Sequence, residues 1–293
     1  GCDIIPIFDK NRNPDMDCTG SYIWLDGAIV PASGNEEIPS GEVTFYEVVR
    51  TRDGVPLFFS DHMNRLKDGI ATRYDLREDI AAEVRAGMKA LANHERHDEI
   101  NVRVTVSFSG YDHSLHICYI PSFYPSETMV REGVPLILHH AERLDPGVKM
   151  LNNRLRLSVN GELARRNAYE ALLVNHDGFI TEGSRSNIFF IAEDGTIQTA
   201  PDSMVLSGIT RRYVTDIILK EGITLVTEAV KESDAGRFRS AFITGTSPMV
   251  LAVRSIEGLQ FNVADPLIGR LREAYSDLAG RSMNDYKMGD EAD

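Results

Sequence analysis

Cysteine is scarce in this chain of 293 residues, and its placement excludes two kinds of structural framework. The three cysteines, Cys2, Cys18 and Cys118, are odd in number, and none of them stands in a C-x-x-C pair. Disulfide frameworks and zinc sites usually show an even set of cysteines or pairs at short spacing. We therefore expect three reduced thiols, no disulfide framework and no zinc site.

Long apolar runs and an excess of positive charge are also missing. No stretch of about 18 apolar residues occurs, and no charged segment followed by an apolar one opens the chain. The net charge is -13 at pH 7, which argues against a general binder of nucleic acids or anionic membranes, because such proteins carry a basic surface. We expect a cytoplasmic protein that binds neither nucleic acid nor membrane.

The chain does contain enough apolar residues for a sizeable core, since its hydrophobic content is 42%, and its length allows two ordinary domains. Residues 1–21, rich in Asp, Asn, Pro and Gly, predict an arm over the surface. Residues 22–121 alternate strand and helix patterns, which is typical of a small α+β domain. We expect a connection at 122–133, a larger cofactor-binding domain at 134–282 and a disordered polar tail at 283–293.

The clearest local prediction is a β-hairpin over residues 22–30, where two apolar segments flank Asp26 and Gly27. Two amphipathic helices are expected after it, the first capped by Ser60 or Asp61 and the second from about residue 78 to 93. In the second half of the chain, the last helix is expected over 266–278.

The stretch from Val148 to Ile191 places a lysine, a helix, a strand, a carboxylate in a small polar turn and another strand in that order. Pyridoxal phosphate chemistry needs an amine that holds the aldehyde as a Schiff base and a carboxylate whose charge keeps the pyridine nitrogen protonated. Lys149 would supply the amine and Glu182 the carboxylate. Taken singly, such a lysine is more often a solvated surface residue, and such a turn only a turn.

Taken together, the stretch resembles the class IV aminotransferases, the pyridoxal phosphate family of branched-chain aminotransferases, D-amino acid aminotransferases and aminodeoxychorismate lyases. The resemblance rests on K-x-L-N headed by Lys149 and on E-G-small-x-small-N from Glu182 to Asn187, and it extends from about Tyr22 to Arg272. It implies a two-domain α+β fold of fold type IV, like that of D-amino acid aminotransferase, with the cofactor in the interdomain cleft. It also implies a homodimer, and it makes Lys149 the general base and acid of catalysis.

Three further segments resemble the phosphate-binding elements of that family. One opens a predicted helix whose free amide groups would face an anion, one is a Gly/Thr/Ser turn with hydroxyl donors, and one is a helix arginine whose guanidinium suits phosphate geometry. Without the resemblance they would be an ordinary capped helix, a turn and an exposed arginine. The cofactor-binding residues implied by the family are Lys149, Glu182, Arg65, Gly208, Ile209, Thr210, Thr246 and Ser247.

The residues that are expected to contact the substrate resemble two different groups of enzymes within the family. The sequence Y-E-V-V from Tyr46 is closest to D-amino acid enzymes, whereas Arg50 is shared with branched-chain enzymes, and Arg103 stands where these carry the arginine that receives a side-chain carboxylate. An arginine in an apolar strand is about as often part of a structural ion pair. We expect a branched-chain-type L-amino acid and a 2-oxo acid such as 2-oxoglutarate as substrates. D-amino acid transamination, aminodeoxychorismate cleavage and cofactor binding without turnover are the alternatives.

Overall fold

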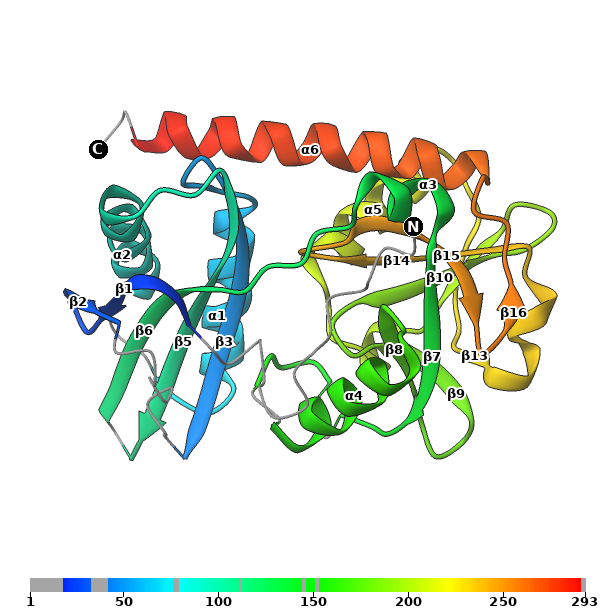
Figure 1. The fold of residues 1–293 in the computed structure, drawn as a ribbon, viewed down its shortest axis with the longest axis horizontal. Helices are drawn as coiled ribbons and strands as arrows, with labels where there is room; N and C mark the ends of the chain where they lie inside the picture. The colour runs from blue at the N-terminus through cyan, green and yellow to red at the C-terminus, as the bar shows by residue number, and fades with distance from the viewer. Residues whose placement is uncertain are drawn as a thin grey trace. The chain divides into compact units, whose positions relative to one another are not determined.

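The computed structural model describes residues 18–32, 42–75, 79–110, 112–143, 146–150 and 153–290. The chain divides into two compact units, which are taken separately below (Figure 1). Of the described residues, the large unit comprises those within 123–147 and 153–277, and the small unit comprises those within 18–122, 148–150 and 278–290. No helix in the described parts of the chain is long and apolar enough to cross a membrane.

The small unit is built on a six-stranded sheet with the strand order β2-β1-β6-β5-β3-β4. The expected hairpin is present, and its turn residues Asp26 and Gly27 have the positive φ angles that a tight hairpin turn requires. The strands are β1 (Thr19–Leu25), β2 (Ala28–Pro31), β3 (Val43–Arg52), β4 (Val55–Pro56), β5 (Glu99–Ser109) and β6 (Asp112–Ile120).

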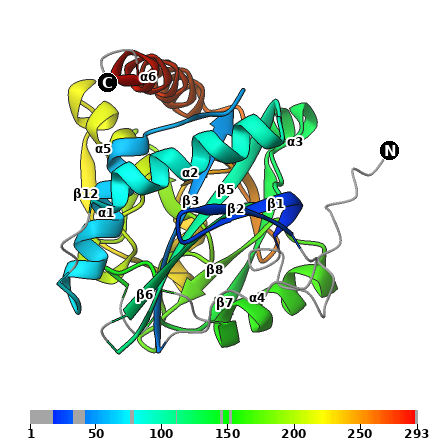
Figure 2. The same cartoon turned by 90° about the vertical axis from the view of Figure 1, so that its left-hand side faces the viewer.

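Two helices, α1 (Phe59–Ala71) and α2 (Ile80–His94), cover one face of this sheet (Figure 2). The side chain of Asp79 caps α2 by accepting a hydrogen bond from the amide of Ala81. The α1 helix begins one residue before the expected cap. Because side chains alternate along a strand, the valines at the even positions 102 to 106 of β5 pack under the helices, and Arg103 faces the other way.

The large unit contains a ten-stranded mixed sheet in the order β12-β11-β10-β14-β15-β7-β8-β9-β13, with β16 beside β15. Side chains on both faces of β8 are buried, one set in the main core and the other under α4, which is typical of a covered parallel region. The strands are β7 (Val134–His140), β8 (Glu170–Val174), β9 (Phe179–Gly183), β10 (Asn187–Ile191), β11 (Ile197–Thr199), β12 (Leu225–Thr227), β13 (Val230–Lys231), β14 (Ser240–Gly245), β15 (Met249–Ile256) and β16 (Leu259–Gln260). The helices are α3 (Glu127–Glu132), α4 (Asn153–Arg166), α5 (Ile209–Lys220), α6 (Pro266–Asp290) and the 3-10 turns η1 (Asp202–Met204) and η2 (Glu232–Arg237).

The C-terminal residues correct one expectation. The disordered tail expected from residue 283 is wrong as far as Asp290, because α6 continues to that residue. Tyr286 is buried, its ring centroid lies 5.3 Å from that of Phe59, and the guanidinium of Arg85 lies 4.3 Å from the Tyr286 ring. The polar residues between the buried positions of this helix conceal its three-to-four-residue spacing.

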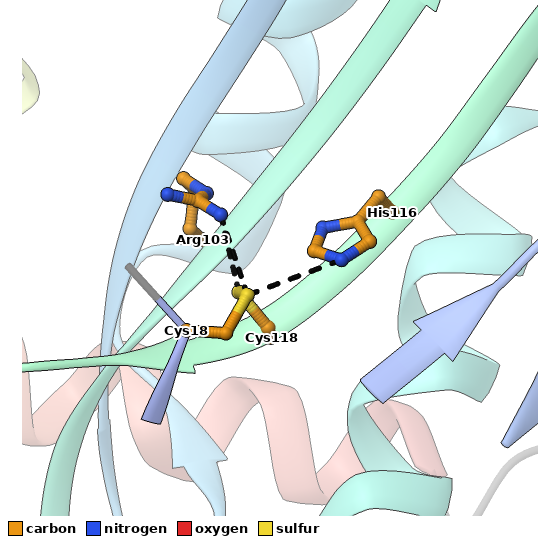
Figure 3. Close-up of a disulfide and its surroundings, with 4 residues drawn as sticks. All are labelled: Cys18, Arg103, His116 and Cys118. Atoms are coloured by element: carbon orange, nitrogen blue, oxygen red, sulfur yellow. Dashed lines mark hydrogen bonds between the residues drawn. A yellow bond between two sulfur atoms is a disulfide. The ribbon is translucent and has the colours of Figure 1, made fainter. Parts of the chain in front are cut away.

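The cysteines correct a second expectation. Cys18 and Cys118 form a disulfide at a sequence separation of 100 (Figure 3), so the reduced state expected from their spacing is wrong for this pair. Cys2 lies outside the described residues. The bond joins β1 to β6 beside the ladder pair of Thr19 and Tyr119, a proximity that only the folded sheet creates.

The two units also differ from the expected domains. The segment Val148–Asn152 and the end of α6 group with the small unit and not with the expected larger domain. The expected connection, 122–133, includes the helix α3. The expected arm remains a prediction for residues 1–17, which lie outside the described chain, and β1 begins at Thr19.

We predict that Tyr286→Ala lowers the free energy of unfolding of the small unit by about 3 kcal/mol, because it leaves a cavity beside Phe59. Urea denaturation followed by the fluorescence of Trp24, the single tryptophan, measures this unit. Met288→Ala is the matched control on the same helix, since its side chain is 69% exposed, and it should change stability by less than about 0.5 kcal/mol. Equal effects of the two substitutions would contradict a structural role for the end of α6.

Candidate active site

Lys149 lies at an edge of β3 in the small unit. The amide of Tyr46 donates a hydrogen bond to the carbonyl oxygen of Lys149 at 3.2 Å, and Phe45 forms an antiparallel bridge with Met150. Val148 and Met150 pack into the core under the helices, so alternation turns the Lys149 side chain to the opposite face. Its Nζ atom lies 4.7 Å from the centroid of the buried Tyr46 ring. The amine is therefore held over an aromatic ring.

The face of the sheet opposite α1 and α2 also carries the three expected substrate residues, and we call it the lysine face (Lys149, Tyr46, Arg50 and Arg103). The register pairs Tyr46 with Thr105 and places Arg103 opposite Val48. Diagonal neighbours on one face lie about 7 to 8 Å apart, so Arg103 is one diagonal step from Tyr46. The Nε atom of Arg50 is 2.9 Å from Oε1 of Glu99. Arg103 is fully buried.

Arg65 lies on the helical side of the same sheet, where it is paired with Glu47. Its Nε and Nη2 atoms donate to the two carboxylate oxygens at 2.7 and 2.6 Å, and His62 Nδ1 donates to Oε2 at 2.8 Å. Burial would raise the pKa of Glu47, but the charge of Arg65 and the hydrogen bonds from His62 and Arg65 bring that pKa well below its ordinary value. The orientation of Arg65 is thus set by a buried carboxylate, a role that the sequence reasoning did not assign.

Glu182 lies near the end of β9 in the large unit, and both of its carboxylate oxygens are engaged. Arg143 Nε lies 2.7 Å from Oε1, and the amide of Leu206 donates to Oε2 at 3.1 Å. Arg143 Nη2 also donates to the carbonyl oxygen of Ser184 at 2.7 Å, so one guanidinium holds the carboxylate and the turn that follows it. Sequence reasoning missed Arg143, because it stands in a connection without a motif.

The turn after Glu182 is organised by a second buried carboxylate, Glu170. Its Oε1 accepts from the amide and hydroxyl of Ser184 at 3.2 and 2.6 Å. Its Oε2 accepts from the amide of Arg185 and the hydroxyl of Ser186 at 3.1 and 3.0 Å. A Cβ atom at Gly183 would collide with the Ser186 hydroxyl. The small residues of this turn are therefore required by hydrogen bonding and space, and Glu170 is a further residue that the sequence reasoning missed.

Asn187 joins this turn to the expected phosphate-binding helix. Its Nδ2 atom donates to the carbonyl oxygen of Leu206 at 3.0 Å, and a Cβ atom at Gly208 would collide with its Oδ1. Gly208 is the N-cap of α5, whose first amide groups have no partner within the helix. The Thr210 hydroxyl lies 3.0 Å from the Tyr275 hydroxyl, so the side chain of this residue is engaged within the large unit.

The second expected phosphate element follows β14 in the same sheet. The register of β10 and β14 places Asn187 opposite Thr244, two residues before Thr246. Thr246 and Ser247 are half-buried. The Thr244 hydroxyl is buried and has no hydrogen-bond partner among the residues that the structure describes. Within the large unit, Asn187 thus brings together the carboxylate turn, the start of α5 and the end of β14, and we call this region the Asn187 junction.

We predict that Glu47→Gln lowers stability at pH 7 by roughly 3 kcal/mol, because Arg65 loses its buried partner. The wild-type contribution of Glu47 is complete above its ordinary pKa of 4.5 and is lost as the pH falls below it, since the folded pKa is lowered. His62, whose pKa burial lowers from 6.5, adds a loss that begins at a higher pH. Denaturant titrations from pH 7 to 3.5 should show a flatter acid limb below pH 4.5 in the variant.

Glu42→Gln, on an exposed residue next to the same strand, is the control for that experiment. It should leave both the stability at pH 7 and the acid limb unchanged. An acid limb of wild-type steepness in Glu47→Gln would show that other groups carry the pH dependence.

Comparison with known proteins relates these two regions to a family. The profile of the amino-transferase class IV family matches residues 44–256. The D-alanine aminotransferase of Bacillus licheniformis is 28% identical over 227 residues, which cover 73% of this chain and 78% of the relative. A putative branched-chain-amino-acid aminotransferase of Methanocaldococcus jannaschii is 28% identical over 255 residues, which cover 80% and 86%.

Solved structures show the same fold. The branched-chain amino acid aminotransferase of Escherichia coli matches with a TM-score of 0.77 at 21% identity, over 89% of this chain and 95% of its own. The branched-chain amino acid aminotransferase of T.th., solved with pyridoxamine 5'-phosphate, matches with a TM-score of 0.77 at 23% identity, over 90% and 96%. The expected fold of type IV is therefore confirmed. The chain belongs to the class IV aminotransferases and is a transaminase of that family.

Proposed function

We propose that this aminotransferase moves the amino group of a branched-chain-type L-amino acid to 2-oxoglutarate, with pyridoxal 5'-phosphate as cofactor. The observation that carries the proposal is the lysine face, on which the amine of Lys149 lies over Tyr46, one diagonal step from the guanidinium of Arg103. An amine and a cation on one face suit a substrate that carries a reacting carbon at one end and a carboxylate at the other.

The chain offers the groups that the cofactor requires. Gly208 lets the Asn187 side chain approach the start of α5, where a Cβ atom would collide with it, and the buried hydroxyl of Thr244 lies at the same junction. Bound pyridoxal 5'-phosphate supplies an aldehyde for amines and a ring that accepts electrons. In this proposal Lys149 would anchor the cofactor, Glu182 would keep its ring nitrogen protonated, and Arg65, the amides of Ile209 and Thr210, and the hydroxyls of Thr246 and Ser247 would hold its phosphate.

Lys149 also carries the proton in this proposal. Its amine would remove the proton from the substrate α-carbon and later return one. Arg143 and the Leu206 amide each contact one oxygen of the Glu182 carboxylate and hold it in one orientation. The negative charge of the carboxylate therefore stays in a fixed position. A positioned negative charge stabilises a positive one in a partly dry site more than in water.

Arg103 is the basis of the substrate proposal, because it lies one diagonal step from Tyr46 on the lysine face. Its guanidinium would receive the distal carboxylate of glutamate or 2-oxoglutarate. A D-amino acid substrate is the second candidate, since the Bacillus licheniformis D-alanine aminotransferase and the Methanocaldococcus jannaschii relative are equally similar at 28% identity. The proposal includes a homodimer, which sedimentation at several concentrations tests.

We predict that Lys149→Ala abolishes transamination and leaves the fold intact, because Lys149 is both the anchor and the proton carrier. Borohydride reduction of the holoenzyme followed by peptide mapping should label Lys149, with Lys220 and Lys231 as internal controls. The visible spectrum of the wild type should change when an amino donor is added. Labelling of another lysine, or a spectrum that no donor changes, would refute the assignment.

We predict that Arg103→Leu raises KM for glutamate and 2-oxoglutarate by about tenfold to a hundredfold and spares leucine, because a charge-assisted hydrogen bond is lost. Half-reaction kinetics with L-glutamate, L-leucine and D-alanine, together with a thermal melt, measure this. Arg96→Leu, at an exposed arginine of the same unit, should change neither substrate. Equal losses on glutamate and leucine with a lowered melting temperature would assign Arg103 to structure alone.

A further inference from the structure

Four side chains gather on the lysine face where β1 meets β6, and we call them the sulfur cluster (Cys18, Arg103, His116 and Cys118). Figure 3 shows the Arg103 guanidinium and the His116 ring directed at the disulfide. Arg103 Nη2 donates to each sulfur at 3.4 Å, and His116 Nε2 lies 3.9 Å from Cys18 Sγ. The role in substrate binding that is proposed above for Arg103 does not explain why its guanidinium contacts the two cysteine sulfurs.

The two cysteine residues differ in their exposure to solvent. Cys118 is fully buried, as is Arg103, whereas Cys18, the residue before β1, is partly exposed. Exchange of a disulfide begins when a thiolate attacks one of its sulfurs, so the accessible sulfur is the point of entry and the other sulfur is the leaving group. Here the leaving group is the sulfur that is buried against a guanidinium.

We propose that Cys18–Cys118 is a thiol–disulfide exchange site for small thiols of the glutathione type, opened at Cys18, with Arg103 stabilising the Cys118 thiolate that departs. A cation within hydrogen-bonding distance favours the thiolate over the thiol. A disulfide whose reduced form is stabilised in this way is more easily reduced than one in apolar surroundings. The site is therefore built for exchange as well as for holding β1 to β6.

The exchange balances in two steps. The thiolate of the first small thiol forms a bond with Cys18 Sγ, the Cys18–Cys118 bond breaks, and its electron pair goes to Cys118 Sγ. The thiolate of a second small thiol then attacks the sulfur of the first and releases Cys18 as a thiolate. Two small thiols are oxidised to one small-molecule disulfide, and the protein disulfide gains two electrons. Of the two protons that the small thiols lose, one goes to Cys18 and the other to solvent, because Cys118 stays a thiolate.

His116 does not compete with Arg103 for this role. Burial and the charge of Arg103 lower the pKa of His116 to about 4, although Asp26 acts in the opposite direction. The imidazole is therefore neutral near pH 7, and the guanidinium is the cation that faces the sulfurs. The potential metal-binding atoms of His116 and of the two cysteines lie within 4.8 Å of one another. Zinc would therefore compete with glutathione for the two cysteines once they are reduced.

The exchange has a consequence for catalysis, which rests on the function proposed above. In the oxidised protein Arg103 faces neutral sulfurs, and in the reduced protein it faces a thiolate that competes with a substrate carboxylate for the guanidinium. Reduction should therefore raise KM for glutamate several-fold and leave KM for leucine unchanged. The redox state of the sulfur cluster would then set the preference between dicarboxylate and apolar substrates.

The test uses the holoenzyme of this 293-residue chain with Cys2→Ser, so that two of its three cysteines remain. The protein is equilibrated in buffers of reduced and oxidised glutathione at pH 7, and its free thiols are trapped with a maleimide that shifts the mass. We expect a reversible transition between the dithiol and the disulfide, and trapped intermediates that carry glutathione on Cys18. The proposal would be overturned if the disulfide of the folded protein stays intact in millimolar reduced glutathione. It would also be overturned if glutathione is found on Cys118 alone.

Arg103 variants separate its role from that of the fold. Arg103→Gln should shift the equilibrium constant toward the disulfide by roughly tenfold or more, because the thiolate loses a charge-assisted hydrogen bond. Arg103→Lys keeps the positive charge and should restore most of the wild-type constant. His116→Gln, a neutral replacement in the same cluster, should change it less than about twofold. The role of the guanidinium would be refuted if the wild type, Arg103→Lys and Arg103→Gln had equal equilibrium constants. Stoichiometric zinc binding in place of glutathione exchange would refute it as well.

The kinetic arm compares half-reactions of the oxidised and reduced enzyme with L-glutamate and L-leucine. A rise of KM for glutamate alone on reduction supports the link to catalysis, and equal values in the two states overturn that link. The glutathione equilibrium is measured without turnover. An enzyme that exchanges thiols but transaminates neither substrate would therefore refute the proposed function and leave the exchange site standing.

Discussion

The burial of ionised carboxylates is the constraint on which both units depend. A carboxylate removed from water is unfavourable unless donors surround it, and three glutamates in strands meet that condition in different ways. Glu47 is matched by Arg65 and His62, Glu170 by the amides and hydroxyls of a turn, and Glu182 by Arg143 and a main-chain amide. Each carboxylate fixes a neighbouring segment, so the positions of the candidate cofactor residues follow from electrostatics as much as from apolar packing.

The sequence predicts those parts of the fold and site whose signals are local. The hairpin at Asp26 and Gly27 follows from turn chemistry, and Gly208 follows from a short motif. Glu170 and Arg143 could not be predicted, because their partners belong to segments that approach only after the sheet has formed. The end of α6 was missed for a related reason, since Tyr286 has apolar neighbours in space and polar neighbours in the sequence.

Strand alternation explains why the candidate substrate residues could be predicted individually but not as a group. Tyr46 and Arg50 share a face because they are separated by an even number of residues along β3. Whether Arg103 joins them depends on the register between β3 and β5, and a slip of one residue would turn it into the apolar core. The disulfide depends on the same kind of long-range register, between β1 and β6, and a count of cysteines carries no information about it.

The bridge between Phe45 and Met150 has a consequence for aggregation. Beyond its short pairing with β4, this edge of β3 would expose unpaired main-chain groups, which can recruit a strand from another molecule. The Lys149 segment covers part of that edge. Changes to the backbone of this segment would therefore uncover the strand edge and favour self-association, whatever they do at Lys149 itself.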